Sequence, residues 1–266
     1  MACCCCCIPH YQDVQAPDIG MELIDSHDCG VFTMKGDSMP LVEVKVPPMQ
    51  TMIGEAGALA YFEDGIQMET KFDDGANVNG LGCCGKFRAS CCRCCSGENM
   101  SLVHFTNETE EERGLAFASN HAGHIVAVDL DELEDHVLFT TNGSFLFGAK
   151  GTRIELARAD CMQCCFGAGL CFQKLDGNGT VFLSGGGTVI KQSLDGETHR
   201  IDSNSLMAFT RGLEVSVQRS GTCMTMCCGG EGLAMTTLSG TGDYWLASSP
   251  LASQLQHILP FLPEKD

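Results

Sequence analysis

The stretch "GSFLFGAKGTRIEL" (143–156) has two counterparts in the chain, "GALAYFEDGIQMET" (57–70) and "NSLMAFTRGLEVSV" (204–217). The three align without a gap, and a glycine follows the small residue that opens each copy at the same distance: Gly65, Gly151 and Gly212. After this glycine, apolar and polar residues alternate, which is typical of a strand with one buried face. The pattern therefore predicts one β unit built three times. We also expect the three glycines at equivalent turns, and Leu59, Phe145 and Leu206 at equivalent inward positions.

A second block follows each copy. It opens on a Cys-Cys pair, at 94–95, 164–165 and 227–228. A large apolar residue stands at the same distance beyond each pair: Phe105, Leu175 and Leu238. The segments "LDGNGTVFLSGG" (175–186) and "LSGTGDYWLASS" (238–249) then read as β-hairpins, because Gly and Asn accept the positive φ of tight turns. The first copy has a longer hairpin tip, the acidic "ETEEER" (108–113).

The composition excludes several classes of protein. Hydrophobic residues make up 44% of the 266 residues and charged residues 19%, which is ordinary for a folded soluble protein. The net charge of −18 repels phosphate backbones, so we expect no nucleic-acid partner. No apolar run is long enough for a transmembrane helix. Hydrophobic attachment to a membrane surface remains compatible with this charge.

Cysteine is the unusual residue, with 19 copies. The start "MACCCCCIPHYQDVQ" (1–15) has neither the basic region nor the long apolar region of a signal peptide, and it lacks a transit-peptide pattern. We therefore expect a cytoplasmic, reducing environment with most thiols free. Five cysteines form a run in this tail: Cys3, Cys4, Cys5, Cys6 and Cys7. A terminal tail has no core to join, so S-acylation is the leading interpretation, with a disordered, unmodified tail as the alternative.

Further cysteines fall in "GCCGKFRASCCRCC" (82–95), "CMQCC" (161–165) and "CMTMCC" (223–228). They can act as small hydrophobic residues in partly buried loops, as metal ligands with C-x-x-C spacing, or as S-acylation sites. The metal interpretation is weak because "CMTMCC" breaks the spacing, and we predict no metal site. The candidates for a membrane- or partner-facing cluster are Cys83, Cys84, Cys91, Cys92, Cys94, Cys95, Cys161, Cys164, Cys165, Cys223, Cys227 and Cys228. The alternative is that these loops fold inward between the repeats.

No motif indicates catalysis. The histidines are scattered, and none lies in a known catalytic arrangement with Ser, Cys or a carboxylate. "HAGH" (121–124) offers two metal nitrogens, but a solvated pair is the simpler interpretation. "SPLASQLQHILPFLP" (249–263) predicts one short helix that begins at Ser249 and Pro250. We therefore predict neither an enzyme nor a resident cofactor.

The sequence resembles a family at four stretches: "MIGEAGALAYFEDGIQMETKF" (52–72), "GENMSLVHFTN" (97–107), "FQKLDGNGTVFLSGGGTVI" (172–190) and "GGEGLAMTTLSGTGDYWLAS" (229–248). This is the family named for altered inheritance of mitochondria, number twenty-four. The resemblance implies three tandem domains like tryptophan RNA-binding attenuation protein, each a short double-stranded β-helix or β-sandwich. It also implies pseudo-threefold symmetry, assembly of copies into rings and no catalytic residues. Fungal relatives are associated with mitochondrial inner-membrane organisation, so a mitochondrial location is the alternative to the cytoplasm.

The expected architecture is therefore all-β with a short C-terminal helix. Its predicted parts are a Cys-rich tail (1–28), three β repeats (29–119, 120–187 and 188–249) and a C-terminal helix and tail (250–266). The expected function is a non-catalytic scaffold, peripheral to a membrane through the acylated tail and the Cys-rich loops. The alternative is a soluble module that binds a small ligand or metal and has an unmodified tail.

Overall fold

The protein is represented by a computed structural model that describes residues 32–36, 39–71, 101–119, 121–156, 172–219 and 234–250. These residues form the β-strands β1 (Phe32–Lys35), β2 (Leu41–Val46), β3 (Thr51–Glu55), β4 (Leu59–Phe62), β5 (Ile66–Lys71), β6 (Leu102–Asn107), β7 (Arg113–Ala118), β8 (Gly123–Asp129), β9 (Val137–Thr141), β10 (Phe145–Ala149), β11 (Arg153–Leu156), β12 (Phe172–Asp176), β13 (Thr180–Gly186), β14 (Val189–Asp202), β15 (Leu206–Thr210), β16 (Leu213–Arg219) and β17 (Ala234–Ala247). The described residues contain no α-helix, only the 3-10 turn η1 (Glu134–His136). The all-β prediction is confirmed. Most of the predicted C-terminal helix lies outside the described residues.

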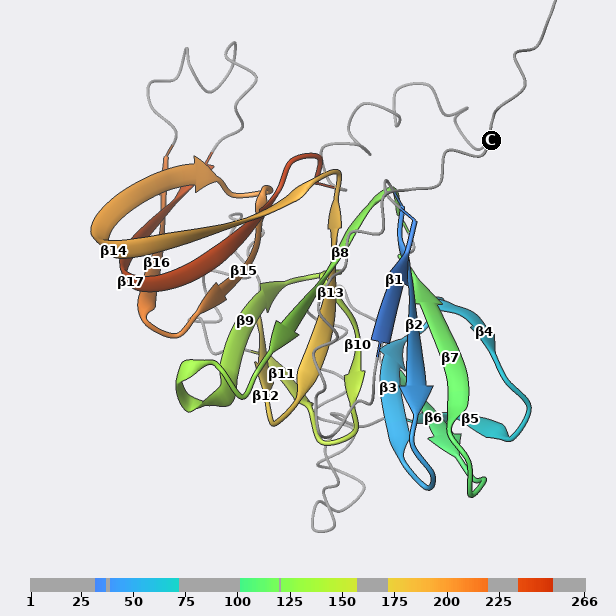
Figure 1. The fold of residues 1–266 in the computed structure, drawn as a ribbon. Helices are drawn as coiled ribbons and strands as arrows, with labels where there is room; N and C mark the ends of the chain where they lie inside the picture. Colours follow the sequence, from blue (N-terminus) through green and yellow to red (C-terminus); the bar gives the residue numbers. More distant parts are fainter. Residues whose placement is uncertain are drawn as a thin grey trace, which may run out of the picture.

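Three antiparallel sheets make up the fold (Figure 1). Their strand orders are β1-β2-β7-β4, then β5-β6-β3-β10-β13-β8, then β11-β12-β9-β15-β17-β14 with β16 also paired to β17. The order of pairing repeats along the chain, so we name six strand positions A to F. They are β2 to β7 in the first repeat and β8 to β13 in the second. In the third repeat, the two halves of β14 are A and B, β15 is C, β16 is D, and the two halves of β17 are E and F.

Each repeat forms two groups of paired strands. Strand F lies between A and C, and strand E lies between B and D, in all three repeats. The register agrees to the residue. The first pair between strands C and F is Leu59↔Phe117, Phe145↔Leu183 and Leu206↔Leu246, and a register shift follows it every time. The predicted triplet of Leu59, Phe145 and Leu206 therefore occupies equivalent positions, with Leu59 only partly buried.

The three repeat glycines lie in the turn between strands C and D, as predicted. Gly65 and Gly151 have φ of 97° and 109°, a backbone conformation that residues with a Cβ atom rarely adopt. Gly212 reaches the same turn without a positive φ, but a Cβ there would lie 2.0 Å from Thr241 O. Both demands exclude a side chain, so one residue type serves all three turns.

The predicted hairpins are wrong. In the first and second repeats, strands E and F belong to different sheets. In the first repeat β6 lies between β5 and β3, whereas β7 lies between β2 and β4. In the second repeat β12 lies between β11 and β9, whereas β13 lies between β10 and β8. In the third repeat "LSGTGDYWLA" (238–247) lies within one long strand, β17, where Gly240 and Gly242 have φ of 110° and 157°. The glycines let the backbone bend from one group of strands to the other, instead of reversing it.

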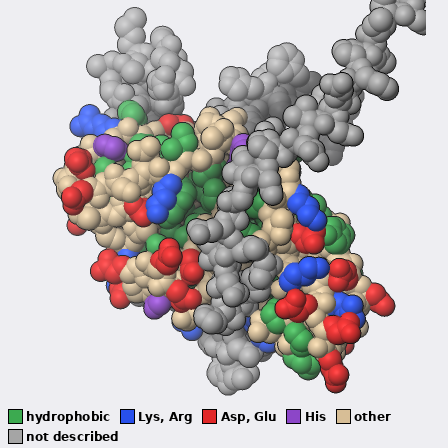
Figure 2. All heavy atoms as spheres, viewed as in Figure 1, with side chains coloured by type: hydrophobic (Ala, Val, Ile, Leu, Met, Phe, Trp, Pro, Cys, Tyr) green, Lys and Arg blue, Asp and Glu red, His purple; other side chains and the backbone are tan. Residues whose placement is uncertain are grey.

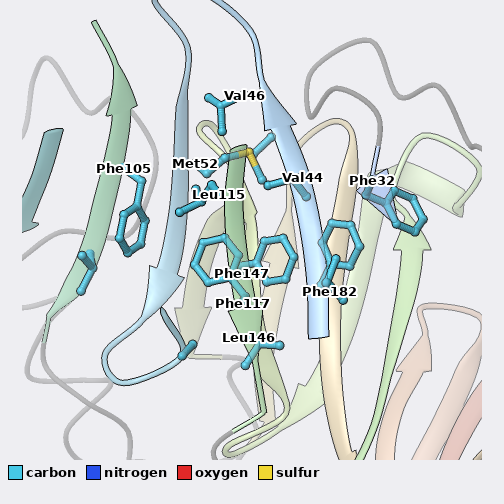
Figure 3. Packing of buried hydrophobic residues seen from close by; sticks show 14 of the residues in the cluster. Phe32, Val44, Val46, Met52, Phe105, Leu115, Phe117, Leu146, Phe147 and Phe182 are labelled. Carbon is cyan, nitrogen blue, oxygen red and sulfur yellow. The ribbon is translucent and has the colours of Figure 1, made fainter. Parts of the chain in front are cut away.

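The core of the first repeat is a column of phenylalanines (Figure 3). Phe147 stacks between Phe117 and Phe182, with ring centroids 4.0 Å and 4.1 Å away. Phe105 and Phe32 meet the two ends of this stack edge-on, at 5.3 Å and 4.9 Å. Offset-stacked and edge-to-face pairs are the favoured arrangements of aromatic rings. The column joins strands of two repeats, because Phe147 and Phe182 belong to the second.

Neighbouring repeats are joined by sheet pairing. Strand C of the second repeat pairs with strand B of the first, and strand C of the third pairs with strand B of the second. Among the described residues, no pairing joins the third repeat back to the first. Because sheets are shared, the boundaries at 29–119, 120–187 and 188–249 stay predictions, as does pseudo-threefold symmetry.

Candidate functional site

The cysteines singled out by the sequence lie outside the described residues. This holds for the tail candidates Cys3 to Cys7 and for all of the loop candidates between Cys83 and Cys228. The prediction that the loop cysteines form a membrane- or partner-facing cluster therefore stays a prediction. The strands that flank these loops are described, and they define the place from which each loop leaves the fold.

Each Cys-rich segment connects strand D to strand E. The pairs closest to the three connections are Lys71↔Leu102, Leu156↔Gln173 and Arg219↔Ala234. The two ends of every segment therefore leave from neighbouring antiparallel strands. The cysteine-rich segments therefore recur at the same place in the strand order: each one connects strands D and E of its own repeat.

Gln173 stands beside the second of these connections. Its side chain is buried, and neither amide atom has a hydrogen-bond partner. Thr140, directly opposite on β9, is also fully buried with an unpaired hydroxyl. Unpaired buried polar atoms cost free energy, so such a pair is a candidate contact for a small polar molecule or a water. Nothing in the local sequence pattern marks these two residues, because Gln and Thr are common on exposed strands.

In the other two repeats, the equivalent position is satisfied. Val103 of the first repeat is apolar and buried. Thr236 of the third repeat is bonded through its hydroxyl to the Ser203 hydroxyl at 2.8 Å. Only the second repeat leaves polar atoms unpaired at this position among the described residues.

The "HAGH" pair is partly buried, where a solvated pair was predicted. Nδ1 of His124 lies 2.7 Å from Gly187 O, so this nitrogen carries the proton and donates to the carbonyl. His121 lies beside Ser119, with Nδ1 3.4 Å from the hydroxyl, and burial lowers the pKa of its imidazole. The two rings thus have separate partners in the packing between β7, β8 and β13. Among the described residues, no group of three or more His, Cys, Asp and Glu side chains is arranged to hold a metal.

The acidic segment 108–113 is a link between two sheets. Buried Asn107 organises it: its side-chain amide donates to Val46 O at 2.8 Å and Glu111 O at 2.7 Å, and its Oδ1 accepts from Thr109 N at 3.0 Å. The carboxylates lie at the tip, where acidic side chains gather on the face shown in Figure 2. The segment is charged and exposed, as its sequence indicates, but it links two sheets and is not the tip of a hairpin. Its shape is set by Asn107.

Comparison with known proteins identifies relatives over nearly all of the described chain. The model of the family described as "Mitochondrial biogenesis AIM24" matches residues 32–249. The uncharacterized protein M6_Spy0233 of Streptococcus pyogenes serotype M6 is 28% identical over 228 residues, which are 83% of this chain and 87% of that protein. The crystal structure of protein SPYM3_0169 from Streptococcus pyogenes has a TM-score of 0.67 and 25% identity, over 87% of this chain and 99% of that one.

Proposed function

The chain belongs to the AIM24 family, and from that premise we propose that it is a non-catalytic β-repeat scaffold on the cytoplasmic surface of a membrane. The observation that carries this proposal is the threefold placement of Cys-rich segments between the same two strands, D and E. A repeated insertion at one structural position supports a shared task for the segments. Cysteine beside Met and Phe, as in "CMQCCF" (161–166), suits contact with apolar surface or S-acylation.

The tail supplies the anchor in this proposal. Thioester-linked acyl chains on Cys3 to Cys7 would hold the protein at a membrane, because two chains suffice for stable attachment. The part of the chain that the structure describes contains no helix that could span a bilayer.

Fractionation with and without hydroxylamine tests the anchor, because this reagent cleaves thioesters. The full chain, expressed in a cell competent for acylation, is expected in the membrane fraction and is released by neutral hydroxylamine. Replacing Cys3 to Cys7 by serine is expected to give the same release without reagent. Full-length protein that fractionates as soluble before treatment would refute the anchor, and enrichment with mitochondria would favour the alternative location.

A matched variant separates the tail from the loops. Serine at Cys161, Cys164 and Cys165 leaves the tail intact and changes one loop. The expected result is unchanged membrane attachment, because the tail alone carries enough thiols. Release by the loop substitutions, with the tail intact, would move the anchor to the loops.

The second candidate function is a soluble module for a small polar ligand. The unpaired side chains of Gln173 and Thr140 favour it, because a bound molecule would satisfy both. Dialysis of the purified native protein, followed by mass spectrometry of the small molecules released on denaturation, tests it. A stoichiometric polar compound that is lost in the double variant Gln173→Met/Thr140→Val would support this function over the scaffold.

A further inference from the structure

Strand C of the first repeat has the composition of a buried strand but lies exposed. Its equivalents β10 and β15 are buried at every residue. In β4, whose sequence is Leu-Ala-Tyr-Phe, the last three residues are exposed, and Tyr61 and Phe62 keep 43% and 40% of their surface. Hydrophobic side chains lie at the right-hand edge of Figure 2, over the region of β4. The unpaired N–H and C=O groups of an exposed edge strand are a template for pairing with another strand.

Strand B of the third repeat is the matching open edge. β3, strand B of the first repeat, is buried throughout, whereas Thr198, His199 and Arg200 in the second half of β14 are exposed. Among the described residues, β4 pairs only with β7, and β14 pairs only with β17. The two edges lie at opposite ends of the molecule (Figure 1), so they are too far apart to meet within one chain.

The two joints inside the chain show how such edges fit. At both joints, strand C of one repeat pairs with strand B of the preceding repeat in the same register. The pairs at the first joint are Phe147↔Gly54, Gly148↔Ile53 and Ala149↔Met52. The pairs at the second are Ala208↔Thr140, Phe209↔Phe139 and Thr210↔Leu138. From these joints, we propose that β4 of one copy pairs antiparallel with residues 198–202 of a second copy, head to tail. The same register places Tyr61 opposite Ile201, Phe62 opposite Arg200 and Glu63 opposite His199.

The backbone of β4 is oriented for this pairing. Glu63 N donates to Gly114 O on the β7 side at 2.9 Å, so the N–H of Phe62 points to the open side. At the first joint, Lys150 N donates to Thr51 O at 3.0 Å. Backbone groups alternate in direction along a strand, so those of Gly148 and Ile53, two residues away, also point into this joint. By equivalence, Phe62 and Arg200 would face each other across the proposed contact, and among the described residues neither strand is paired on that side.

Side-chain chemistry agrees with the register. Phe147 enters the core of the first repeat and Ala208 enters the core of the second. The equivalent residue Tyr61 would enter the core of the third repeat of the neighbouring copy, against which Ile201 already packs. On the other face, the Arg200 guanidinium would lie beside the Phe62 ring. Glu63 and His199 would form the next pair, on the same face as Tyr61 and Ile201, and a carboxylate opposite an imidazole is a favourable cross-strand pair.

A head-to-tail contact repeats, so copies assemble into a closed ring or an open filament according to the rotation at each step. This inference names a second copy of the chain as the partner of the scaffold and does not depend on acylation. Unacylated protein, made in a host without the modification and kept reduced, therefore tests it separately from the membrane proposal.

The decisive experiment mixes two edge-blocked chains. Phe62→Pro removes the outward N–H of β4, and Arg200→Pro removes that of β14, while each chain keeps its other edge. Light scattering coupled to gel filtration is expected to show concentration-dependent assembly of the native chain, monomers of each variant alone, and a 1:1 dimer that grows no further when the two are mixed. A native chain that stays monomeric at every concentration overturns the proposal. Dimers of Arg200→Pro alone would do so as well, because they would show that β4 pairs with itself.

A charge exchange keeps the test valid if either proline variant fails to fold. Phe62→Lys places a cation opposite Arg200 and is expected to abolish assembly, and adding Arg200→Glu in the same chain is expected to restore it. Met68→Lys is the matched control, because Met68 is an exposed apolar residue on β5 outside the proposed contact. Loss of assembly in Met68→Lys, or no restoration by the second exchange, contradicts the register.

Discussion

The two joints between repeats have the same backbone register but different packing. At the first joint, Gly54 lies opposite Phe147, whose ring stacks on Phe117 directly over the glycine. At the second joint, Thr140 lies opposite Ala208. The second joint therefore has a threonine and an alanine where the first has a glycine and a phenylalanine. Gln173 lies opposite Thr140 on the neighbouring strand.

The contrast shows that the repeat conserves pairing and leaves packing to each joint. Backbone hydrogen bonds need no particular side chain, so the register tolerates Gly-Phe and Thr-Ala alike. The side chains must fill the same space at close-packed density. The first joint does so with an aromatic column, whereas the second leaves the Thr140 hydroxyl and the Gln173 amide unpaired.

Removing the ring at the first joint is expected to have the largest effect. Phe147→Ala leaves a cavity between Phe117 and Phe182 and should lower the free energy of unfolding by about 3–5 kcal/mol. Denaturant unfolding of the full chain measures it, with Met68→Ala at an exposed position as the control. A loss close to that of the control would mean that the column is not the centre of this joint.

Adding a side chain beneath the ring is expected to cost less. A Cβ at Gly54 would lie 3.0 Å from Phe117 Cε1 and 3.5 Å from Phe147 Cβ, so Gly54→Ala should destabilise the fold by about 1–3 kcal/mol. The same unfolding measurement applies. The comparison variant is Ala208→Gly, which changes the equivalent pair at the second joint. Gly143→Ala does not serve as a control, because the positive φ of 76° at Gly143 would add backbone strain. Equal losses in Gly54→Ala and Ala208→Gly would contradict the difference between the joints.

Making the second joint apolar is expected to stabilise the protein. Thr140→Val and Gln173→Met keep the approximate volume and remove unpaired polar atoms, so each should raise the free energy of unfolding by about 1 kcal/mol. Thr141→Val is the opposing control, because the Thr141 hydroxyl donates to Leu206 O at 3.0 Å and its removal should destabilise. Destabilisation by the first two substitutions would indicate that a water or ligand satisfies those atoms in solution.

The smallest expected effect concerns pH at the junction of the first and second repeats. Burial lowers the pKa of His121 in the folded protein below its usual 6.5. As the pH falls below about 6.5, the unfolded chain binds the proton first, so His121 should make the folded state progressively less stable until the pH reaches its folded pKa. His121→Gln should flatten this decline in thermal unfolding curves recorded across the range. An unchanged pH dependence would assign the decline to other groups.

Local patterns predicted much of the fold and less of the candidate site. Gly65, Gly151 and the alternation that follows them are short-range features, and the turns and strands were found where these features predict them. Gln173 and Thr140 could not be found in this way, because their burial depends on strands 30 residues apart being paired. The cysteines, which dominate the sequence, lie outside the described residues and remain predictions.

By itself, the sequence determined that the chain is a threefold β repeat, because alternation and glycine conformation are properties of neighbouring residues. Only the tertiary structure decided which sheet each strand joins. "LDGNGTVF" (175–182) crosses between two sheets and "LSGTGDYW" (238–245) bends within one strand, although both carry glycines at the same two positions. Glycine permits either path, and the choice is made by the partners that each strand finds far along the chain. The exposure of β4 is likewise decided by pairing: among the described residues it pairs only with β7, whereas its equivalents β10 and β15 are paired on both sides.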